Sequence, residues 1–489
     1  MSLGSAWSVG LSGLSTASDQ MALVSRNVAR AGDVSATRKV GEQVTTATGS
    51  VRLAVVGRVA NPLLLEGLLS SRSNYAGESV TAAALDRLHL AVLDPKLDQS
   101  PAAFIAALDG SLRLLANDPT SQAAASELLG SAHSVAKSLN DATAIISAVR
   151  SDADRAIADS VTALNVTLRE LEGVNREIVT APAHADMTDQ LDKRDALLKL
   201  VADHVGIRVV PRGANDISVY TDSGVTLFET VARKVTFNSS GVLGPGVTGH
   251  VVTIDGLDVT GPDALMPLRS GSIVAQIDVR DNIAPTFQTQ MDELARGLIE
   301  AFSDPDRSGG GKPNLPGLFT WTGATVPPSG SAIAGLAARI TVNSQIDPGR
   351  GGSLSYLRDG GSSAPGDPDY NANISGASGF SGRLFELVGN LSEERKFDSA
   401  SGLRSRSSIL DFSSESVGWI DARRQSSTNR LELRTIIRDR ADQSLLSVTG
   451  VNLDQEMADL LRFEQSFQAS SRLIATIDQM IETILEVAR

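Results

Sequence analysis

The stretch LDQEMADLLRFEQSFQASSRLIATIDQMIETIL, residues 453–485, repeats a large apolar residue every seven positions. The members of this row, with the apolar residues three or four positions away, are Leu453, Leu460, Phe463, Phe467, Ile474, Ile477, Ile481 and Ile484. A narrow apolar stripe with a period of about 3.5 residues is typical of a helix that packs against another helix. The stripe is too narrow to enclose a large core alone, so it predicts a helix that needs a partner.

The first thirty residues carry a matching stripe in which spacings of four and three alternate. Its members are Leu3, Trp7, Gly10, Leu14, Ala17, Met21, Val24 and Val28. The charges of the two ends are complementary, because residues 1–40 carry four basic and two acidic groups, whereas residues 451–489 carry three basic and seven acidic groups. These features predict a coiled coil between the termini of a chain that assembles with copies of itself or with relatives. A helix packed on its own domain is the alternative, which the stripe alone does not exclude.

Composition limits the class of protein. The 489 residues suggest about two to four domains, and aromatic residues make up only 4%, so the cores must consist of Leu, Val, Ile and Ala. The net charge of −13 argues against a nucleic-acid partner. The absence of cysteine excludes disulfides, thiolate metal sites and cysteine nucleophiles. No apolar run approaches the length of a membrane span, and residues 1–30 lack the pattern of a cleavable signal peptide, so we expect any export to leave the N-terminus uncut.

The interior of the chain predicts a mainly α fold with an inserted β domain. The ranges expected to be helical are 1–30, 75–179, 186–205, 281–302, 383–397 and 414–446, with 121–179 as one long helix. The ranges expected to be β-rich are 51–59, 207–210, 217–220, 225–229, 234–237 and 251–254. Residues 321–380 are rich in Gly, Ser and Pro and predict irregular structure with a short buried stretch at 340–342.

The expected organisation has four parts. These are a coiled-coil layer (1–50 and 447–489), a long-helix bundle (51–205, 270–320 and 381–446), a small β domain that projects outward (206–269) and a loop-rich segment (321–380). Because helices precede and follow the β insert, the two halves are expected to pair in space, with the middle of the chain projecting from the far end.

Three glycine-rich or acidic motifs imitate ligand sites. Residues 244–249 fit GxGxxG, but a strand follows them where a dinucleotide site requires a helix. Residues 309–312, GGGK, lack the Ser or Thr that must follow the lysine of a phosphate loop. Asp367, Asp369, Asn371 and Asn373 are spaced like the start of a calcium loop, but Ala372 and Ser378 replace its glycine and its bidentate glutamate. We interpret all three as loops.

No catalytic, cofactor or metal site is expected either. The histidines have no partner at ligand spacing; they are His89, His133, His184, His204 and His250. Asp192 and Asp195 lie beside Lys193 and Arg194 on a predicted helix, which favours an ion-pairing surface over a general acid–base pair. The chain is therefore not expected to be an enzyme.

Residues 447–474, SVTGVNLDQEMADLLRFEQSFQASSRLI, resemble the terminal helix of bacterial flagellar axial proteins, the family that forms the rod, the hook and the hook-associated structures. Three further segments resemble the hook-associated members that join hook to filament. They are residues 190–198 (QLDKRDALL), residues 271–295, and residues 13–14 with 27–29. Length and residues 190–198 favour the first of the two junction proteins, with the second junction protein and the hook protein as close alternatives. Residues 30–37 lack the second asparagine and the Thr-Pro-Gly-Tyr-like turn that the family usually has there.

The resemblance implies an inner coiled-coil layer, a middle helical layer and an outer β domain. It also implies export through the flagellar type III apparatus, polymerisation into a tube at the hook–filament junction outside the cell, and contacts with the hook protein, the second junction protein and, at the C-terminal helix, a cytoplasmic chaperone. No nucleic-acid or membrane partner is implied. The residues expected to carry self-assembly and partner contacts are Leu3, Trp7, Leu14, Met21, Val24, Val28, Leu453, Leu460, Phe463, Phe467, Ile474, Ile477, Ile481 and Ile484.

Two hypotheses from other classes stay open at this point. One is a secreted coiled-coil adhesin or effector that binds ligands through its β insert. The other is an enzyme whose site lies in the Gly/Ser-rich region.

Overall fold

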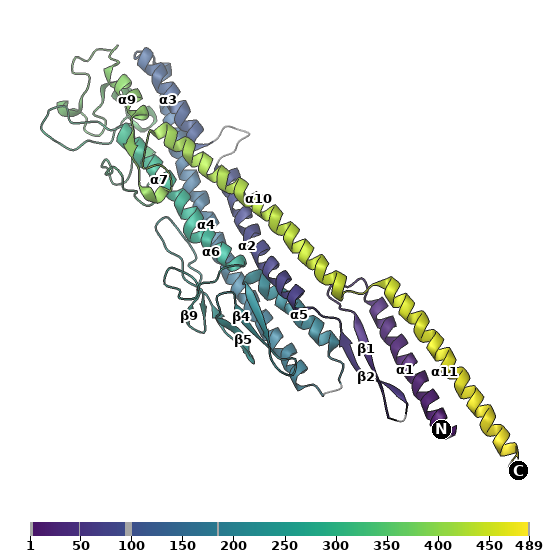
Figure 1. The fold of residues 1–489 in the computed structure, drawn as a ribbon. Helices are drawn as coiled ribbons and strands as arrows, with labels where there is room; N and C mark the ends of the chain where they lie inside the picture. The colour runs from purple at the N-terminus through teal and green to yellow at the C-terminus, as the bar shows by residue number, and fades with distance from the viewer. Residues whose placement is uncertain (1–2, 48, 93–99, 183–184, 488–489) are drawn as a thin grey trace.

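The computed structural model describes residues 3–47, 49–92, 100–182 and 185–487. It shows an elongated molecule in which both chain ends lie at one extremity (Figure 1). The long helices that run along it are α1 (Leu3–Ala29), α2 (Pro62–Val92), α4 (Gln122–Thr180), α10 (Ile409–Thr449) and α11 (Leu453–Val487). The prediction of a mainly α fold with long helices and a β insert is confirmed.

Helix α4 forms the axis of the body. Its 59 residues correspond to about 88 Å at the helical rise. The helix starts where the Ser121 side chain accepts a hydrogen bond from the Ala124 N–H at 3.2 Å, which is the usual chemistry of an N-cap. Buried side chains recur every three or four residues along it. The long helix expected at 121–179 is therefore present.

Two hydrophobic cores share α4. The first half of α4, up to Ala153, packs with α3 (Pro101–Asn117), α7 (Ala284–Ala301), α9 (Gly382–Ser392) and the start of α10. The second half, from Ile157, packs with α5 (Thr188–His204) and the β insert. Each fully buried Leu, Ile or Val in these cores contributes about 1.5–3 kcal/mol, so α4 holds the two halves of the body together.

The β insert consists of two small antiparallel sheets. The first contains β3 (Ile207–Pro211), β4 (Ile217–Thr221), β5 (Thr226–Glu229) and β6 (Val231–Ala232), and the second contains β7 (Val235–Thr236), β8 (Thr253–Ile254) and β9 (Leu257–Asp258). Val219, Leu227 and Phe228 are completely buried in the core that these strands share with α4 and α5. Strands β3, β4, β5, β7 and β8 lie in the ranges expected to be β-rich, whereas β6 and β9 were not expected.

The position of the β insert differs from the expectation. It lies along the flank of α4 and α5 rather than at the far end of the molecule (Figure 1), because its apolar side chains are buried against the second half of α4. The far end is formed instead by residues around α9 and the irregular segment.

Several element boundaries also differ. Helix α2 begins at Pro62 rather than 75, since Asn61 Oδ1 accepts a hydrogen bond from the Leu64 N–H at 3.1 Å. Helix α10 begins at Ile409 rather than 414, where Ser408 caps it. Helix α9 ends at Ser392 rather than 397, because β12 (Arg395–Lys396) pairs with β13 (Arg406–Ser407). A helix expected from 281 begins earlier, as α6 (Ser272–Asp278) runs through a π-helical turn, η1 (Val279–Ile283), into α7.

Residues 321–380 are largely irregular, as predicted. Their short elements include β11 (Thr341–Val342), which pairs with β10 (Phe319–Thr320), and α8 (Ser355–Asp359). Ile340 and Val342 are buried, so the short buried stretch is confirmed. A buried ion pair of 2.6 Å between Arg383 and Asp304 lies where this segment meets α9.

The motifs that imitate ligand sites have local structural roles. Lys312 of the GGGK loop forms an ion pair of 2.5 Å with Asp369. Asp367 caps a 3-10 turn by accepting the Asp369 N–H at 3.0 Å. In the GxGxxG loop, the carbonyl oxygens of Gly244 and Val247 accept hydrogen bonds from Arg150. The calcium-like spacing is thus explained by turn chemistry.

Candidate assembly interface

The two termini form an antiparallel pair of helices, α1 and α11, at the end of the molecule opposite the irregular segment (Figure 1). Two glycines allow a close approach. A Cβ on Gly10 would lie 3.1 Å from Ile474 Cγ1, and a Cβ on Gly13 would lie 3.0 Å from Ser470 Oγ. Small residues at such crossings let two backbones approach each other.

Most of the residues predicted for assembly are at least partly buried. On α1, Val24 is buried; on α11, Ile477 is buried. The half-buried members of the predicted set are Leu3, Trp7, Leu14, Met21, Leu460, Phe463, Phe467, Ile474 and Ile481. Val28, Leu453 and Ile484 lie outside the seam and are exposed. The pairing of α1 with α11 within a single chain therefore buries only part of each apolar stripe.

Helix α11 exposes two further apolar rows. The proximal row consists of Leu453, Met457 and Leu461, and the distal row consists of Leu473, Met480 and Ile484; each side chain is between 47% and 57% exposed. At about 100° of rotation per residue, the two rows fall on opposite flanks of the seam. Concentrated exposed apolar surface of this kind marks an interaction site. A helix with an apolar row on each flank has surface for two different neighbours.

A β-hairpin covers one flank of α1 (Figure 1). It consists of β1 (Lys39–Thr45) and β2 (Val51–Arg58), and only the second strand was expected. Thr16 Oγ1 donates to the Val51 carbonyl at 3.0 Å, and Gln20 Nε2 donates to the Gly41 carbonyl at 3.2 Å. A Cβ on Gly41 would lie 2.5 Å from Leu53 Cδ1 and 2.8 Å from Gln20 Nε2, so a larger residue here would make both side chains shift.

A buried polar cluster closes the seam near the body. Asn27 Nδ2 donates to Glu456 Oε2 at 3.0 Å and to the Lys39 carbonyl at 2.9 Å. Arg38 forms ion pairs of 2.6 Å with Glu456 and 2.7 Å with Asp459. Glu456 is completely buried, so these partners compensate for its lost contact with water. One polar contact inside an apolar helix seam fixes the register of the two helices.

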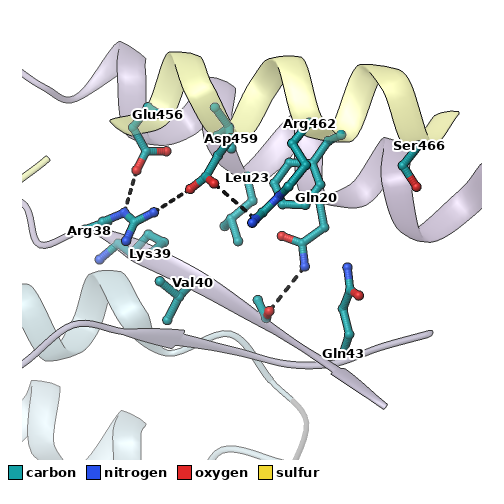
Figure 2. Close-up of a pocket in the computed structure, with 13 residues that line it drawn as sticks. Gln20, Leu23, Arg38, Lys39, Val40, Gln43, Glu456, Asp459, Arg462 and Ser466 are labelled. Atoms are coloured by element: carbon teal, nitrogen blue, oxygen red, sulfur yellow. Dashed lines mark hydrogen bonds and ion pairs between the residues drawn. The ribbon is translucent and has the colours of Figure 1, made fainter. Parts of the chain in front are cut away.

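Figure 2 shows Arg38, Glu456 and Asp459 of this cluster on the wall of a groove between α11 and the hairpin, with a volume of about 550 Å³. Arg38 lies between Glu456 and Asp459, and Arg462 forms a further ion pair of 3.0 Å with Asp459. Gln20 points across the groove to the β1 backbone. The groove is polar and open, and the ion pairs on its wall link α11 to the residues that lead into the hairpin.

An acidic row at the start of α5 fastens the terminal layer to the body. The row comprises Asp186, Asp189, Asp192 and Asp195. From α1 and the residue that follows it, Arg26 binds Asp186 at 2.7 Å and Arg30 binds Asp189. From the hairpin, Lys39 binds Asp192, and Arg58 binds Asp192 at 3.0 Å and Asp195 at 2.7 Å. The prediction that Asp192 and Asp195 form ion pairs is correct. The prediction that they form a surface is wrong for Asp192, because the hairpin covers it and leaves it 4% exposed.

The contacts of the acidic row lower the pKa of two of its carboxyl groups. Burial alone would raise the pKa of Asp192, but hydrogen bonds from Lys39 and Thr37 outweigh burial and hold its pKa below the ordinary value. Burial would also raise the pKa of Asp186, but the hydrogen bonds from Thr188 and Arg26 outweigh burial and lower this pKa. A carboxyl with a lowered pKa in the folded state stabilises that state above its ordinary pKa and loses this effect as the pH falls.

We therefore expect the attachment of the terminal layer to weaken as the pH falls below about 4, the ordinary aspartate pKa. The measurement is energy transfer between one dye on α11 and one on α4, at introduced cysteines, which are unique because the chain has none. Asp192→Asn should remove much of the pH dependence. A distance that stays constant from pH 6 to pH 3, while the body remains helical, would contradict the assignment.

Two of the described histidines have acidic partners. His184 lies outside the described residues; of the other histidines, His89 pairs with Asp421 at 2.8 Å and His133 with Asp347 at 3.4 Å. Within the described ranges, no group of three or more His, Asp or Glu side chains is placed to hold a metal ion. Nor does any described helix have the length and apolar character needed to cross a membrane.

Two segments of the chain match family profiles of flagellar proteins. Residues 96–317 match the family profile of the flagellar hook-associated protein FlgK helical domain, and residues 442–487 match that of the flagellar basal body rod FlgEFG protein C-terminal region. Flagellar hook-associated protein 1 of Bacillus subtilis (strain 168) is 21% identical over 442 residues, which are 85% of this chain and 81% of the relative. The flagellar hook junction protein FlgK from Burkholderia pseudomallei has 18% identity and a TM-score of 0.41, over 52% of this chain and 46% of that one.

Paired terminal helices on a long-helix body, together with these two family segments, support a structural role in the bacterial flagellum and a likeness to the hook-associated class. Within that class, the chain is similar to hook-associated protein 1, which confirms the resemblance predicted from the sequence.

Proposed function

We propose that the chain polymerises through α1 and α11 to form the junction between hook and filament. The terminal pair would form the inner layer of a tube, the helical body a middle layer and residues 206–269 the outer surface. The hook protein and the second junction protein would be its neighbours at the two ends of the zone.

The observation that carries this proposal is the pair of exposed apolar rows on α11. The seam face of α11 is already occupied by α1 within the same chain, yet six large apolar side chains remain about half exposed. Two different contact surfaces on one subunit produce heterologous contacts, which build rings or helical assemblies rather than closed dimers. A tube is the assembly of this kind that suits a flagellar protein.

The same surface supports export before assembly. A helix with so much exposed apolar surface invites aggregation before its neighbours arrive, which supports a cytoplasmic chaperone that covers α11. Export through the flagellar type III apparatus would then deliver the chain to the hook tip, outside the cell. The helices of the terminal pair would gain their last contacts only there.

Deletion of residues 453–487 tests the proposal. In a bacterium that depends on this chain, the truncated protein should be absent from hook tips and motility should be lost, because both the seam and the exposed rows are gone. Labelled hooks examined by microscopy give the measurement, and circular dichroism of the purified truncated chain checks that the body still folds. Junctions of normal appearance built from the truncated chain would refute the proposal.

A further inference from the structure

A buried carboxylate of α7 binds the backbone of the irregular segment. Asp292 is only 2% exposed. Its Oδ2 accepts a hydrogen bond from the Gly335 N–H at 2.9 Å, and its Oδ1 accepts one from the Ala337 N–H at 2.8 Å. We call residues 332–342, which contain both of these N–H groups, the Asp292 loop.

The Asp292 loop fills part of the hydrophobic core that α4 and α7 share. Leu336 and Ile340 are completely buried in this core. Asn140 of α4 also binds the loop, because its Nδ2 donates to the carbonyl oxygens of Ala337 at 2.6 Å and Ile340 at 3.3 Å. Buried backbone groups outside helices and sheets need side-chain partners, so Asp292 and Asn140 keep the loop in place.

Asp292 has no cation as a partner among the residues that the structure describes. Its third partner is the neutral amide of Gln288, whose Nε2 donates to Oδ1 at 3.0 Å. Arg339 of the loop donates to the carbonyl oxygens of Ala334 and Gly335, both at 3.0 Å, instead of to the carboxylate. A buried carboxylate without a cation is costly to ionise.

The surrounding charged side chains are engaged elsewhere. Helices α4 and α10 present neutral side chains to this part of α7, with Thr143 bound to Gln288 and Ser416 bound to Gln290. Charged side chains on α7 and on the segments that follow it pair with one another or bind backbone N–H groups. They include Glu293, Arg296, Glu300, Asp304, Arg383 and Asp398.

These surroundings favour the neutral form of Asp292. Burial raises the pKa of Asp292 to about 6 from the ordinary 3.8, although the N–H groups of Ala337 and Gly335 oppose the rise. A carboxyl with a raised pKa stabilises the folded state fully below its ordinary pKa, and this effect is lost as the pH rises through the folded pKa. A protonated Asp292 becomes a donor, and the Oε1 of Gln288, which has no hydrogen-bond partner among the described residues, is an acceptor on the adjoining amide.

We propose that Asp292 is a proton-dependent latch of the Asp292 loop. In its neutral form it keeps the loop closed on α4 and α7. In its ionised form, after the proton has passed to water, it favours opening of the loop, which exposes Leu336 and Ile340. The body of the molecule thus has a segment that opens more readily near neutral pH than in acid, independently of the terminal pair.

Hydrogen exchange of the loop amides in the full-length chain tests the latch. After correction for the intrinsic pH dependence of exchange, the opening of residues 335–340 should increase roughly fiftyfold from pH 4 to pH 7 and then level off, as the raised pKa requires. Proteins held by ion-paired carboxylates loosen on acidification instead, so closure of the loop at low pH is distinctive. Opening that stays constant or decreases from pH 4 to pH 7 would overturn the proposal.

Two variants assign the effect. Asp292→Asn should make the opening independent of pH, because the amide does not titrate. The matched control is Asp398→Asn: Asp398 also accepts an N–H of the loop, from Ala332 at 3.0 Å, but it is half-buried, and bonds from the Ala400 and Ala332 N–H groups lower its pKa. This control should keep the increase.

An increase that persists in Asp292→Asn, or that disappears in Asp398→Asn, would show that Asp292 is not the latch. Circular dichroism checks that each variant is folded. If Asp292→Asn does not fold, the unmodified chain and Asp398→Asn still decide between the two outcomes.

Discussion

Asp192→Ala is expected to weaken the attachment of the terminal layer to the body by about 3–5 kcal/mol. Asp192 is buried and binds the Lys39 ammonium, Arg58 at 3.0 Å and Thr37 Oγ1 at 2.6 Å. Without it, the side chain of Lys39, itself buried, keeps only the more distant and exposed Asp189, 3.5 Å away. An uncompensated charge inside protein is the costly outcome of breaking such a pair.

Hydrogen exchange of the hairpin amides, residues 39–58, measures this loss, because the hairpin is the element that Asp192 holds. Asp189→Ala is the matched control: it removes a carboxylate from the same helix that is about half exposed, so it should cost at most about 1 kcal/mol. Equal effects of the two substitutions would show that the buried pair does not anchor the terminal layer.

Glu456→Ala is expected to loosen the pairing of α1 with α11 by about 2–3 kcal/mol, the range for buried hydrogen bonds to a charged group. Glu456 joins Asn27 of α1 to Arg38 at distances of 3.0 Å and 2.6 Å. Arg38 retains Asp459 and Asn27 retains the Lys39 carbonyl, which limits the loss.

A designed disulfide reads out this pairing. A Cβ on Gly13 lies 3.8 Å from Ser470 Cβ, within the range that a disulfide requires, so Gly13→Cys with Ser470→Cys should link the two helices within one chain. Glu456→Ala should make this disulfide form more slowly and should make it easier to reduce. The control is Glu464→Ala, an exposed residue whose side chain accepts only from Gln468, and it should have no effect. A disulfide that forms equally well in both variants would show that Glu456 does not fix the register of α1 and α11.

The helices and the seam were predictable because their signal is periodic. The seven-residue spacing from Leu460 to Ile481 and the uninterrupted helical pattern of α4 follow from the geometry of a helix. An apolar stripe with this period indicates a helix that packs along that stripe. The hook-associated resemblance was equally visible, since it lies in contiguous segments such as 190–198.

The joint between terminal layer and body was not predictable in the same way. Glu456 lies among apolar residues, where a charged side chain is normally taken to face water, and its partners are more than 400 positions away. The acidic row at the start of α5 has a spacing of three, but nothing local shows that Lys39 and Arg58 will bury it. Strand β1 was missed because most of its residues are exposed and polar, so the alternation that marks a half-buried strand is absent.

The central claim is that the exposed apolar rows of α11 hold neighbouring subunits together. The most direct test is a variant with Met457→Gln, Leu461→Gln and Met480→Gln, which leaves the seam and the polar cluster untouched, examined by sedimentation under conditions in which the unmodified chain assembles. We predict a monomer with unchanged helical content that still forms the 13–470 disulfide but does not polymerise. Assembly of this variant as complete as that of the unmodified chain would contradict the claim.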